Sequence, residues 1–232
     1  VIEAVNISKT IEDKLLFSHF THHSTPGERI GIIGPNGCGK STLLNVLCGA
    51  MTTDTGSVKI GTSGNIGYFK QENDDFDPSM SVHATLRAIA EFIDTGVGRD
   101  RYLSASDMLN KFHFPPQQQN SLVGTLSGGE RRRLALLMVL MKNPNVLFLD
   151  EPTNDFDIQT LNALEEYLQH FLGFLVIVSH DRMFLDRTVE YIYSFDGNGH
   201  IQLYPGIYTD YLLRKENEKG GPVSDEDAKA KK

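Results

Sequence analysis

Hydrophobic residues along this chain fall into short continuous runs that alternate with stretches of helical periodicity. The strand-like runs are residues 29–33, 146–150 and 174–179, and the helical stretches are 41–49, 130–142 and about 157–171. Continuous apolar runs of this length are typical of strands that are covered on both faces. Because such strands alternate with helices, the pattern predicts an α/β fold with a mostly parallel core sheet.

Two further regions predict antiparallel strands. Within the first thirty residues the side chains alternate in the manner of edge strands, most clearly at 4–8, so an antiparallel β part is expected at the N-terminus. Residues 57–61 and 65–69 have strand-like patterns with turn residues between them, and we interpret them as a β-hairpin.

Residues 76 to about 125 have a different character from the core. Helical periodicity at 82–93 and 104–114 predicts a small helical subdomain inserted into an α/β domain that spans residues 1–214. The remaining residues, 215–232, hold a single bulky apolar side chain, Val223. Such a segment buries too little apolar surface to offset its ordering entropy, so we expect a flexible charged linker or tail.

The composition narrows the class of protein. With 232 residues, 40% hydrophobic and 22% charged, the chain resembles an ordinary soluble globular domain. Its formal net charge of −8 makes the domain as a whole a poor electrostatic match for nucleic acid. The run of arginines at 131–133 could contact nucleic acid, or it could form a solvated helix face that pairs with nearby acids. We favour the second interpretation.

Cysteine content and hydropathy indicate a cellular setting. Two cysteines are too few for a disulfide framework, which favours a reducing, cytoplasmic location. The longest apolar run, at 134–141, is far shorter than the roughly twenty residues that a membrane span needs, and we see no signal peptide. Because the chain begins at Val1, we expect it to be a piece of a longer protein.

The strongest chemical motif is "GPNGCGKS", residues 34–41, which lies between a predicted strand and a predicted helix. It fits the phosphate-binding pattern G-x-x-x-x-G-K-[ST], in which glycines allow backbone N–H groups to point at phosphate oxygens. Lys40 supplies a positive charge for the β- and γ-phosphates, and the Ser41 hydroxyl can bind Mg²⁺. The predicted ATP-binding residues here are Gly34, Pro35, Asn36, Gly37, Cys38, Gly39, Lys40, Ser41 and Thr42. We also expect the Cys38 thiol to be sensitive to alkylation.

Three other segments place polar side chains at the ends of predicted strands. Asp150 and Glu151 follow a buried strand, where Asp150 would bind Mg²⁺ and Glu151 would polarise the attacking water. Alternatively, this acidic pair only caps the following helix. His180 and Gln71 also follow strands, so the histidine could orient the water and the glutamine could complete the metal's ligands. In isolation, each could equally be a structural or surface residue.

A second anion-binding stretch, "LSGGE" at 126–130, comes almost ninety residues after the first. Taken in order, these motifs resemble the ATP-binding cassette (ABC) ATPase superfamily over about residues 1–213. The resemblance implies a P-loop NTPase fold of ABC type, ATP and Mg²⁺ as cofactors, Glu151 and His180 as catalytic residues, and Gln71 as a ligand of ATP and metal. It also implies that Ser127, Gly128 and Gly129 bind ATP held by a second cassette, either in the same full-length chain or in a homodimer. Asn154, Asp155 and Asp157 look like the D-loop.

Finer features resemble one branch of that superfamily. "LDEPTNDFD", "SHDRMFLD" and "YPGIYTDYLLRK" are similar to the ABC-F family. The combination of "LSGGERRR", "EPTNDFD" and "DGNGHIQLYPG" is closest to the second cassette of its Uup-type subgroup. This resemblance implies a cytoplasmic protein that acts on ribosomes in translation, with a DNA-related role as a weaker alternative. Ile11 stands where the family has an aromatic residue that stacks on adenine, which leaves the choice between ATP and GTP open.

Two other functional classes remain open from the sequence. The chain could be the motor subunit of an ABC transporter, although its short helical subdomain and its "YPGIYTDYL" ending are against this. It could also be an ATP-dependent clamp with little hydrolysis, although the presence of both Glu151 and His180 is against that.

Overall fold

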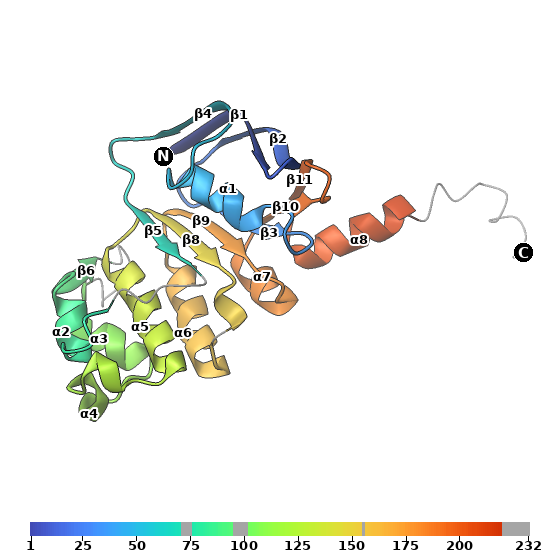
Figure 1. Cartoon of the computed structure of the whole chain (residues 1–232). Coiled ribbons are helices and arrows are strands. Elements are labelled where there is room, and N and C mark those ends of the chain that lie inside the picture. Colours follow the sequence, from blue (N-terminus) through green and yellow to red (C-terminus); the bar gives the residue numbers. More distant parts are fainter. Residues whose placement is uncertain (71–75, 95–101, 155, 220–232) are drawn as a thin grey trace, which may run out of the picture.

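The computed structural model describes residues 1–70, 76–94, 102–154 and 156–219 (Figure 1). The strands are β1 (Ile2–Ile11), β2 (Lys14–His23), β3 (Arg29–Ile33), β4 (Thr55–Ile60), β5 (Ile66–Phe69), β6 (Phe92–Asp94), β7 (Tyr102–Ser104), β8 (Val146–Asp150), β9 (Phe174–Val178), β10 (Tyr191–Phe195) and β11 (Ile201–Pro205). The helices are α1 (Lys40–Leu47), α2 (Val82–Arg87), α3 (Ala105–Lys111), α4 (Pro116–Gln119), α5 (Gly128–Met141), α6 (Ile158–Gln169), α7 (Arg182–Thr188) and α8 (Tyr208–Lys219), with short 3-10 turns η1 (Val123–Thr125) and η2 (Pro152–Asn154).

A six-stranded sheet in the order β11-β10-β3-β9-β8-β5 forms the centre of the molecule. All neighbouring strands in it are parallel except β10 and β11, which pair antiparallel. Helix α1 lies on one face of this sheet, and α5, α6 and α7 cover the other face (Figure 1). The predicted α/β class with a mostly parallel core sheet is therefore confirmed.

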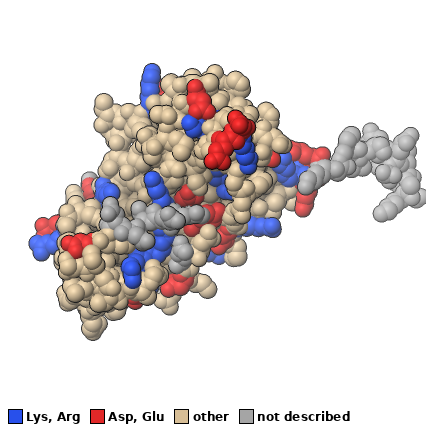
Figure 2. All heavy atoms as spheres, viewed as in Figure 1, with Lys and Arg blue, Asp and Glu red and all other residues tan. Residues whose placement is uncertain are grey.

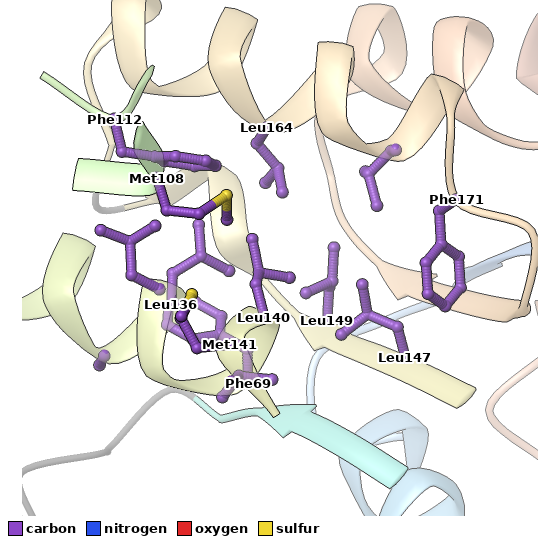
Figure 3. Close-up of a cluster of buried hydrophobic side chains, with 14 of the residues drawn as sticks. Phe69, Met108, Phe112, Leu136, Leu140, Met141, Leu147, Leu149, Leu164 and Phe171 are labelled. Carbon is purple, nitrogen blue, oxygen red and sulfur yellow. The ribbon is translucent and has the colours of Figure 1, made fainter. Parts of the chain in front are cut away.

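The continuous apolar runs form these central strands because each strand is buried on both faces. In β8, Val146 and Phe148 pack into a hydrophobic cluster with α1 and the N-terminal strands. Leu147 and Leu149 point the opposite way, into a cluster with α5 and α6 (Figure 3). Successive strand residues point to opposite faces, so an uninterrupted apolar run satisfies both layers.

The antiparallel part predicted at the N-terminus is confirmed, but the predicted hairpin at 57–69 is wrong. Strand β4 pairs with β1 at the edge of a three-stranded sheet ordered β2-β1-β4, whereas β5 joins the central sheet beside β8. The reason is burial. Residues of β4 are mostly exposed, as suits an edge strand, whereas Phe69 at the end of β5 is fully buried in the core.

The helical subdomain contains α2, α3, α4 and an unexpected strand pair, β6 and β7. The helix predicted over 82–93 therefore ends at Arg87. Ile93 and Leu103 are buried on one face of the strand pair while Phe92 and Tyr102 are exposed on the other, and this two-residue period suits strands. At the other end of the chain, α8 continues to Lys219, so the first residues of the predicted tail, 215–219, are helical.

Charged side chains of both signs are interspersed on the face shown in Figure 2. Of the arginines at 131–133, the first is exposed and the other two are partly buried, and the Arg133 guanidinium lies 3.9 Å from the Asp157 carboxylate. Arg131 donates to the Leu126 carbonyl and Arg133 donates to two carbonyls of the α3–α4 loop, while the Arg132 guanidinium lies 4.0 Å from the centre of the Phe69 ring. Within the described ranges, no helix has the length and hydropathy needed to cross a membrane.

Candidate functional site

The carboxyl ends of the central parallel strands meet at one edge of the sheet, where the candidate site lies. The phosphate-binding motif follows β3, the acidic pair lies at the end of β8 and just after it, and His180 follows β9. In open α/β sheets, ligands bind at this edge because the loops and the helix N-termini converge there. The structure thus brings together groups that are more than a hundred residues apart in the sequence.

The phosphate-binding loop has the backbone that its glycines predict. Gly34, Gly37 and Gly39 have φ angles of 151°, 69° and 109°, and Gly39 is the N-cap of α1. At Gly39 a Cβ would lie 2.8 Å from the Cβ of Leu16, so a side chain would also collide. The Lys40 ammonium donates to the carbonyls of Gly34 and Pro35 at 2.9 and 3.0 Å, which places its charge against the loop.

The β1–β2 hairpin contacts this loop, and the sequence alone did not predict that contact. The Lys14 ammonium donates to the Gly37 carbonyl at 2.8 Å. Glu12 and Asp13 both have positive φ, as a tight two-residue hairpin turn requires. Ile11, directly before the turn, is 38% exposed. The sequence shows a lysine at position 14, but it does not show that this lysine contacts Gly37, because the contact depends on how the hairpin packs against the loop.

Asp150 at the end of β8 is only 4% exposed. Burial raises the pKa of this carboxyl, against the lowering effects of the Ser41 hydroxyl, the Tyr68 hydroxyl and the Lys40 charge. Tyr68 donates to its Oδ2 at 3.4 Å, whereas Oδ1 is buried without a hydrogen-bond partner in the described part of the chain. An open carboxylate oxygen beside a serine hydroxyl fits the oxygen ligands that Mg²⁺ prefers.

Glu151 and His180 form a contact pair next to Asp150. The Nε2 atom of His180 lies 3.2 Å from Oε1 of Glu151, and the histidine side chain is 54% exposed whereas the glutamate side chain is 6% exposed. Burial raises the pKa of Glu151, although the nearby charges of His180 and Lys40 lower it. The pair therefore joins a buried carboxylate to an exposed ring, and the N-cap of the following helix α6 is Asp157, not Asp150 or Glu151.

The surroundings of Cys38 do not favour the alkylation that the sequence predicted. Its side chain is 3% exposed, and burial raises the pKa of its thiol despite the lowering effect of Lys40. Reaction with alkylating agents requires an accessible thiolate. The expectation that Cys38 is readily alkylated is therefore at odds with the structure, because the residue packs into the core beneath the loop.

The second anion-binding stretch caps α5, which is the longest helix within the described ranges. The Ser127 hydroxyl accepts a hydrogen bond from the Glu130 N–H, and the Glu130 carboxylate accepts from the N–H and hydroxyl of Ser127 at 2.8 Å each. Gly128 and Gly129 are exposed, and a Cβ at either position would have no heavy atom within 4 Å. This helix N-terminus is therefore open to solvent and carries no steric barrier to an approaching group.

The D-loop residues lie directly after the acidic pair. Asn154 ends the short turn η2, and Asp157 is the N-cap of α6, where its Oδ1 accepts from the Thr160 N–H at 2.7 Å. The predicted residues Gln71 and Asp155 lie outside the described residues. Their roles remain predictions.

Comparisons with known proteins give the site a family context. A profile of the family described as "ABC transporter" matches residues 17–154. The uncharacterized ABC transporter ATP-binding protein YfmR of Bacillus subtilis is 46% identical over 222 residues, which is 96% of this chain and 35% of that protein. The ATP-binding protein Uup of Haemophilus influenzae is 40% identical over the whole of this chain and 35% of its own length. The energy-dependent translational throttle protein EttA of Escherichia coli K12 is 36% identical over 95% of this chain and 39% of its own length.

The chain therefore spans a little over a third of the length of these relatives.

Solved structures show the same fold at low sequence identity. An ATP-binding subunit of an ABC transporter superposes with a TM-score of 0.74 at 18% identity and covers 93% of both chains. The cassette MJ0796, solved as a dimer in a post-hydrolysis state with ADP and Pi, superposes with a TM-score of 0.69 at 20% identity and covers 88% of this chain and 98% of its own.

Proposed function

The chain belongs to the ABC transporter family of ATP-binding cassettes, and on this basis we propose that it binds and hydrolyses ATP at the edge of its central sheet. One observation carries the proposal: the loop that holds Lys40 converges with a buried carboxylate pair, Asp150 and Glu151. The Lys40 charge is close enough to lower the pKa of both carboxyls. Phosphate binding and activation of water therefore take place side by side.

Binding rests on the phosphate loop. The backbone N–H groups of residues 34–42 and the positive end of α1 attract the phosphates, and Lys40 exchanges its carbonyl partners for phosphate oxygens. Ser41, Asp150 and, by family resemblance, Gln71 would hold Mg²⁺, which would neutralise phosphate charge. Asp150 supports this role because its Oδ1 has no other partner among the described residues.

Hydrolysis rests on Glu151 and His180. A carboxylate in a buried site keeps an unusually high affinity for protons, which suits a base that must take a proton from water near neutral pH. The His180 ring, 3.2 Å from that carboxylate, orients it from the solvent side. This is the arrangement from which we infer that the chain is an ATPase and not only an ATP-dependent clamp.

The test is Glu151→Gln in the full chain, with Glu166→Gln as a control that removes an equal charge from the surface of α6. ATP hydrolysis should fall by at least about 100-fold in Glu151→Gln, which is the usual effect of losing a general base. ATP affinity should be retained. Hydrolysis at the normal rate in Glu151→Gln would refute the assignment of the base.

We further propose that ATP is enclosed between two cassettes, with the signature residues Ser127, Gly128 and Gly129 contacting the γ-phosphate bound by the partner. The exposed N-terminus of α5 supports this, because Gly128 and Gly129 are exposed there and allow close approach. The cassette MJ0796, which was solved as a dimer, supports it as well. Sedimentation of Glu151→Gln with and without ATP tests the idea, since trapped ATP should favour a dimer.

The cellular role proposed for the full-length protein is control of a translation-linked step by a cytoplasmic ABC-F protein, of which this chain is the second cassette. The support is the identity to EttA, whose name describes a translational throttle, and to Uup. Ribosome co-sedimentation of the full-length protein, with and without Glu151→Gln, tests this role. ATP-dependent retention on ribosomes is expected, whereas its absence would favour a DNA-related or a transporter role.

A further inference from the structure

The two oxygens of the Asp150 carboxylate have different surroundings. Oδ2 accepts a hydrogen bond from the Tyr68 hydroxyl at 3.4 Å, whereas Oδ1 is buried and has no hydrogen-bond partner in the described part of the chain. A buried carboxylate oxygen without a donor is costly, so a folded protein keeps one where a ligand will satisfy it. The tyrosine thus occupies one oxygen and leaves the other without a hydrogen-bond partner among the described residues, while the Ser41 hydroxyl lies near enough to the carboxylate to lower its pKa.

Tyr68 is itself held in place by the central sheet. Strands β5 and β8 are parallel neighbours, and Tyr68 pairs in register with Phe148, two residues before Asp150. The ring packs edge-on against Phe148, with centroids 6.0 Å apart and planes at 85°. The ammonium of Lys70 lies 5.0 Å from the centre of the Tyr68 ring. These contacts fix the ring, and through it the direction of the hydroxyl.

The hydroxyl acts toward Asp150 as a donor. A tyrosine hydroxyl carries its proton at neutral pH and an ionised carboxylate can only accept, so Tyr68 donates to Oδ2 of Asp150. A group that can only donate to this carboxylate cannot compete with it for a cation. It can restrict the rotation of the carboxylate, as hydrogen-bonded neighbours of metal-binding carboxylates do.

We propose that Tyr68 is a positioning residue that holds Oδ2 of Asp150 so that Oδ1 binds the divalent cation of the nucleotide. The inference rests on the proposed function of this site. According to this proposal, the affinity of the site for the cation depends on Tyr68 of β5 as well as on the Asp150 carboxylate of β8.

The experiment measures the affinity of the full chain for ADP by calorimetry, once with excess Mg²⁺ and once with EDTA. The ratio of the two affinities reports the contribution of the metal without any turnover. Tyr68→Phe should reduce this ratio by about tenfold, the lower end of the range for groups that hold a metal ligand. Its affinity for ADP in EDTA should match the wild type.

Tyr193→Phe is the matched control, because it removes a buried tyrosine hydroxyl from the same sheet, one bonded to His22. Its ratio should equal that of the wild type. An unchanged ratio in Tyr68→Phe would overturn the proposal, and so would an equal loss of affinity in both buffers, which would indicate damage to the whole edge. If the wild type binds no ADP in either buffer, the proposed function itself fails.

Discussion

Glu151 combines two features that a residue selected only for stability would lack. Its carboxylate is buried at 5% exposure, and its backbone has a φ of +50°, in the left-handed region. That conformation costs a non-glycine residue about 1–2 kcal/mol. Both costs occur at the proposed catalytic base, where strained and buried groups are commonly kept for function.

The pKa of Glu151 gives a prediction about stability. Burial raises it above the usual value of 4.5, so the folded protein holds this proton more readily than the unfolded chain does. Above that folded pKa the ionised carboxylate destabilises the fold, and below about 4.5 the group is protonated in both states and contributes nothing. Glu151→Gln should therefore increase the free energy of unfolding at pH 7.5 while it abolishes hydrolysis.

Urea unfolding of wild type, Glu151→Gln and Glu166→Gln at pH 7.5 and pH 4.5 checks this expectation. The advantage of Glu151→Gln should shrink at the lower pH. The exposed control should stay within about 0.5 kcal/mol of the wild type at both. A Glu151→Gln protein that is less stable than wild type at pH 7.5 would contradict the argument.

At the scale of residues, contiguous motifs were predictable and distant partners were not. The conformation of residues 34–41 follows from local backbone chemistry, since glycines permit the positive φ angles that the loop needs. By contrast, Tyr68 and Asp150 are 82 positions apart, and their contact exists only because β5 and β8 are neighbours. The same holds for Lys14 and Gly37.

Among the elements, the first turn of α5 contains residues that stabilise the helix and that also belong to the proposed ATP contact. The Glu130 carboxylate accepts from both the N–H and the hydroxyl of Ser127, and these are groups that we propose to donate to a partner's phosphate. The hydrogen bonds from Ser127 hold the pKa of Glu130 below its usual value, so the group is ionised at neutral pH. An anion therefore lies where another anion is expected to bind.

Replacement of this charge should strengthen the proposed association. Glu130→Gln keeps a side chain that can complete the capping box, but it removes the repulsion between a carboxylate and the incoming phosphate. We expect ATP-driven dimerisation in the Glu151→Gln background to tighten by up to about fivefold, since ~1 kcal/mol corresponds to that factor. Helix stability should fall slightly, because an acidic group at a helix N-terminus is favourable by about 0.3–1 kcal/mol.

Sedimentation equilibrium of Glu151→Gln and of the double variant, each with ATP, measures the change. Glu166→Gln in the same background is the control for net charge. Weaker association of the double variant would show that the carboxylate assists the contact and would contradict the electrostatic argument.

Prediction at the scale of elements failed where pairing depends on the rest of the fold. Residues 57–61 and 65–69 have strand patterns and a turn between them, and both strands exist. The two strands have different partners: β4 pairs with β1, and β5 pairs with β8 in the core. Strand β5 packs closely there at Gly67, because a Cβ at this position would lie 2.9 Å from side-chain atoms of Pro144 and Val139. Local pattern predicts a strand but not its neighbour.

On the scale of the whole molecule, His22 connects the N-terminal sheet to the central sheet. Its ring stacks on Phe174 of β9 with centroids 5.4 Å apart, and its Nδ1 lies 2.9 Å from the Tyr193 hydroxyl of β10. Glu28 lies 3.5 Å from Nε2. Burial lowers the pKa of His22, and the charge of His23 acts in the same direction, while Glu28 opposes both. The net effect keeps a neutral ring at the junction.

This junction should make the stability of the whole chain sensitive to mild acid. Above the usual histidine pKa of 6.5 the ring is neutral in both states, so it adds no pH dependence. As the pH falls below 6.5, the unfolded chain takes up the proton first, and the free energy of unfolding decreases until the pH passes below the folded pKa. His22→Gln should flatten this decrease between pH 7.5 and 5.5. His23→Gln changes the exposed neighbour on the same strand and should retain most of the decrease. Urea unfolding of the wild type and the two variants across this pH range measures the free energy of unfolding. An equal slope in wild type and His22→Gln would show that the acid sensitivity arises elsewhere.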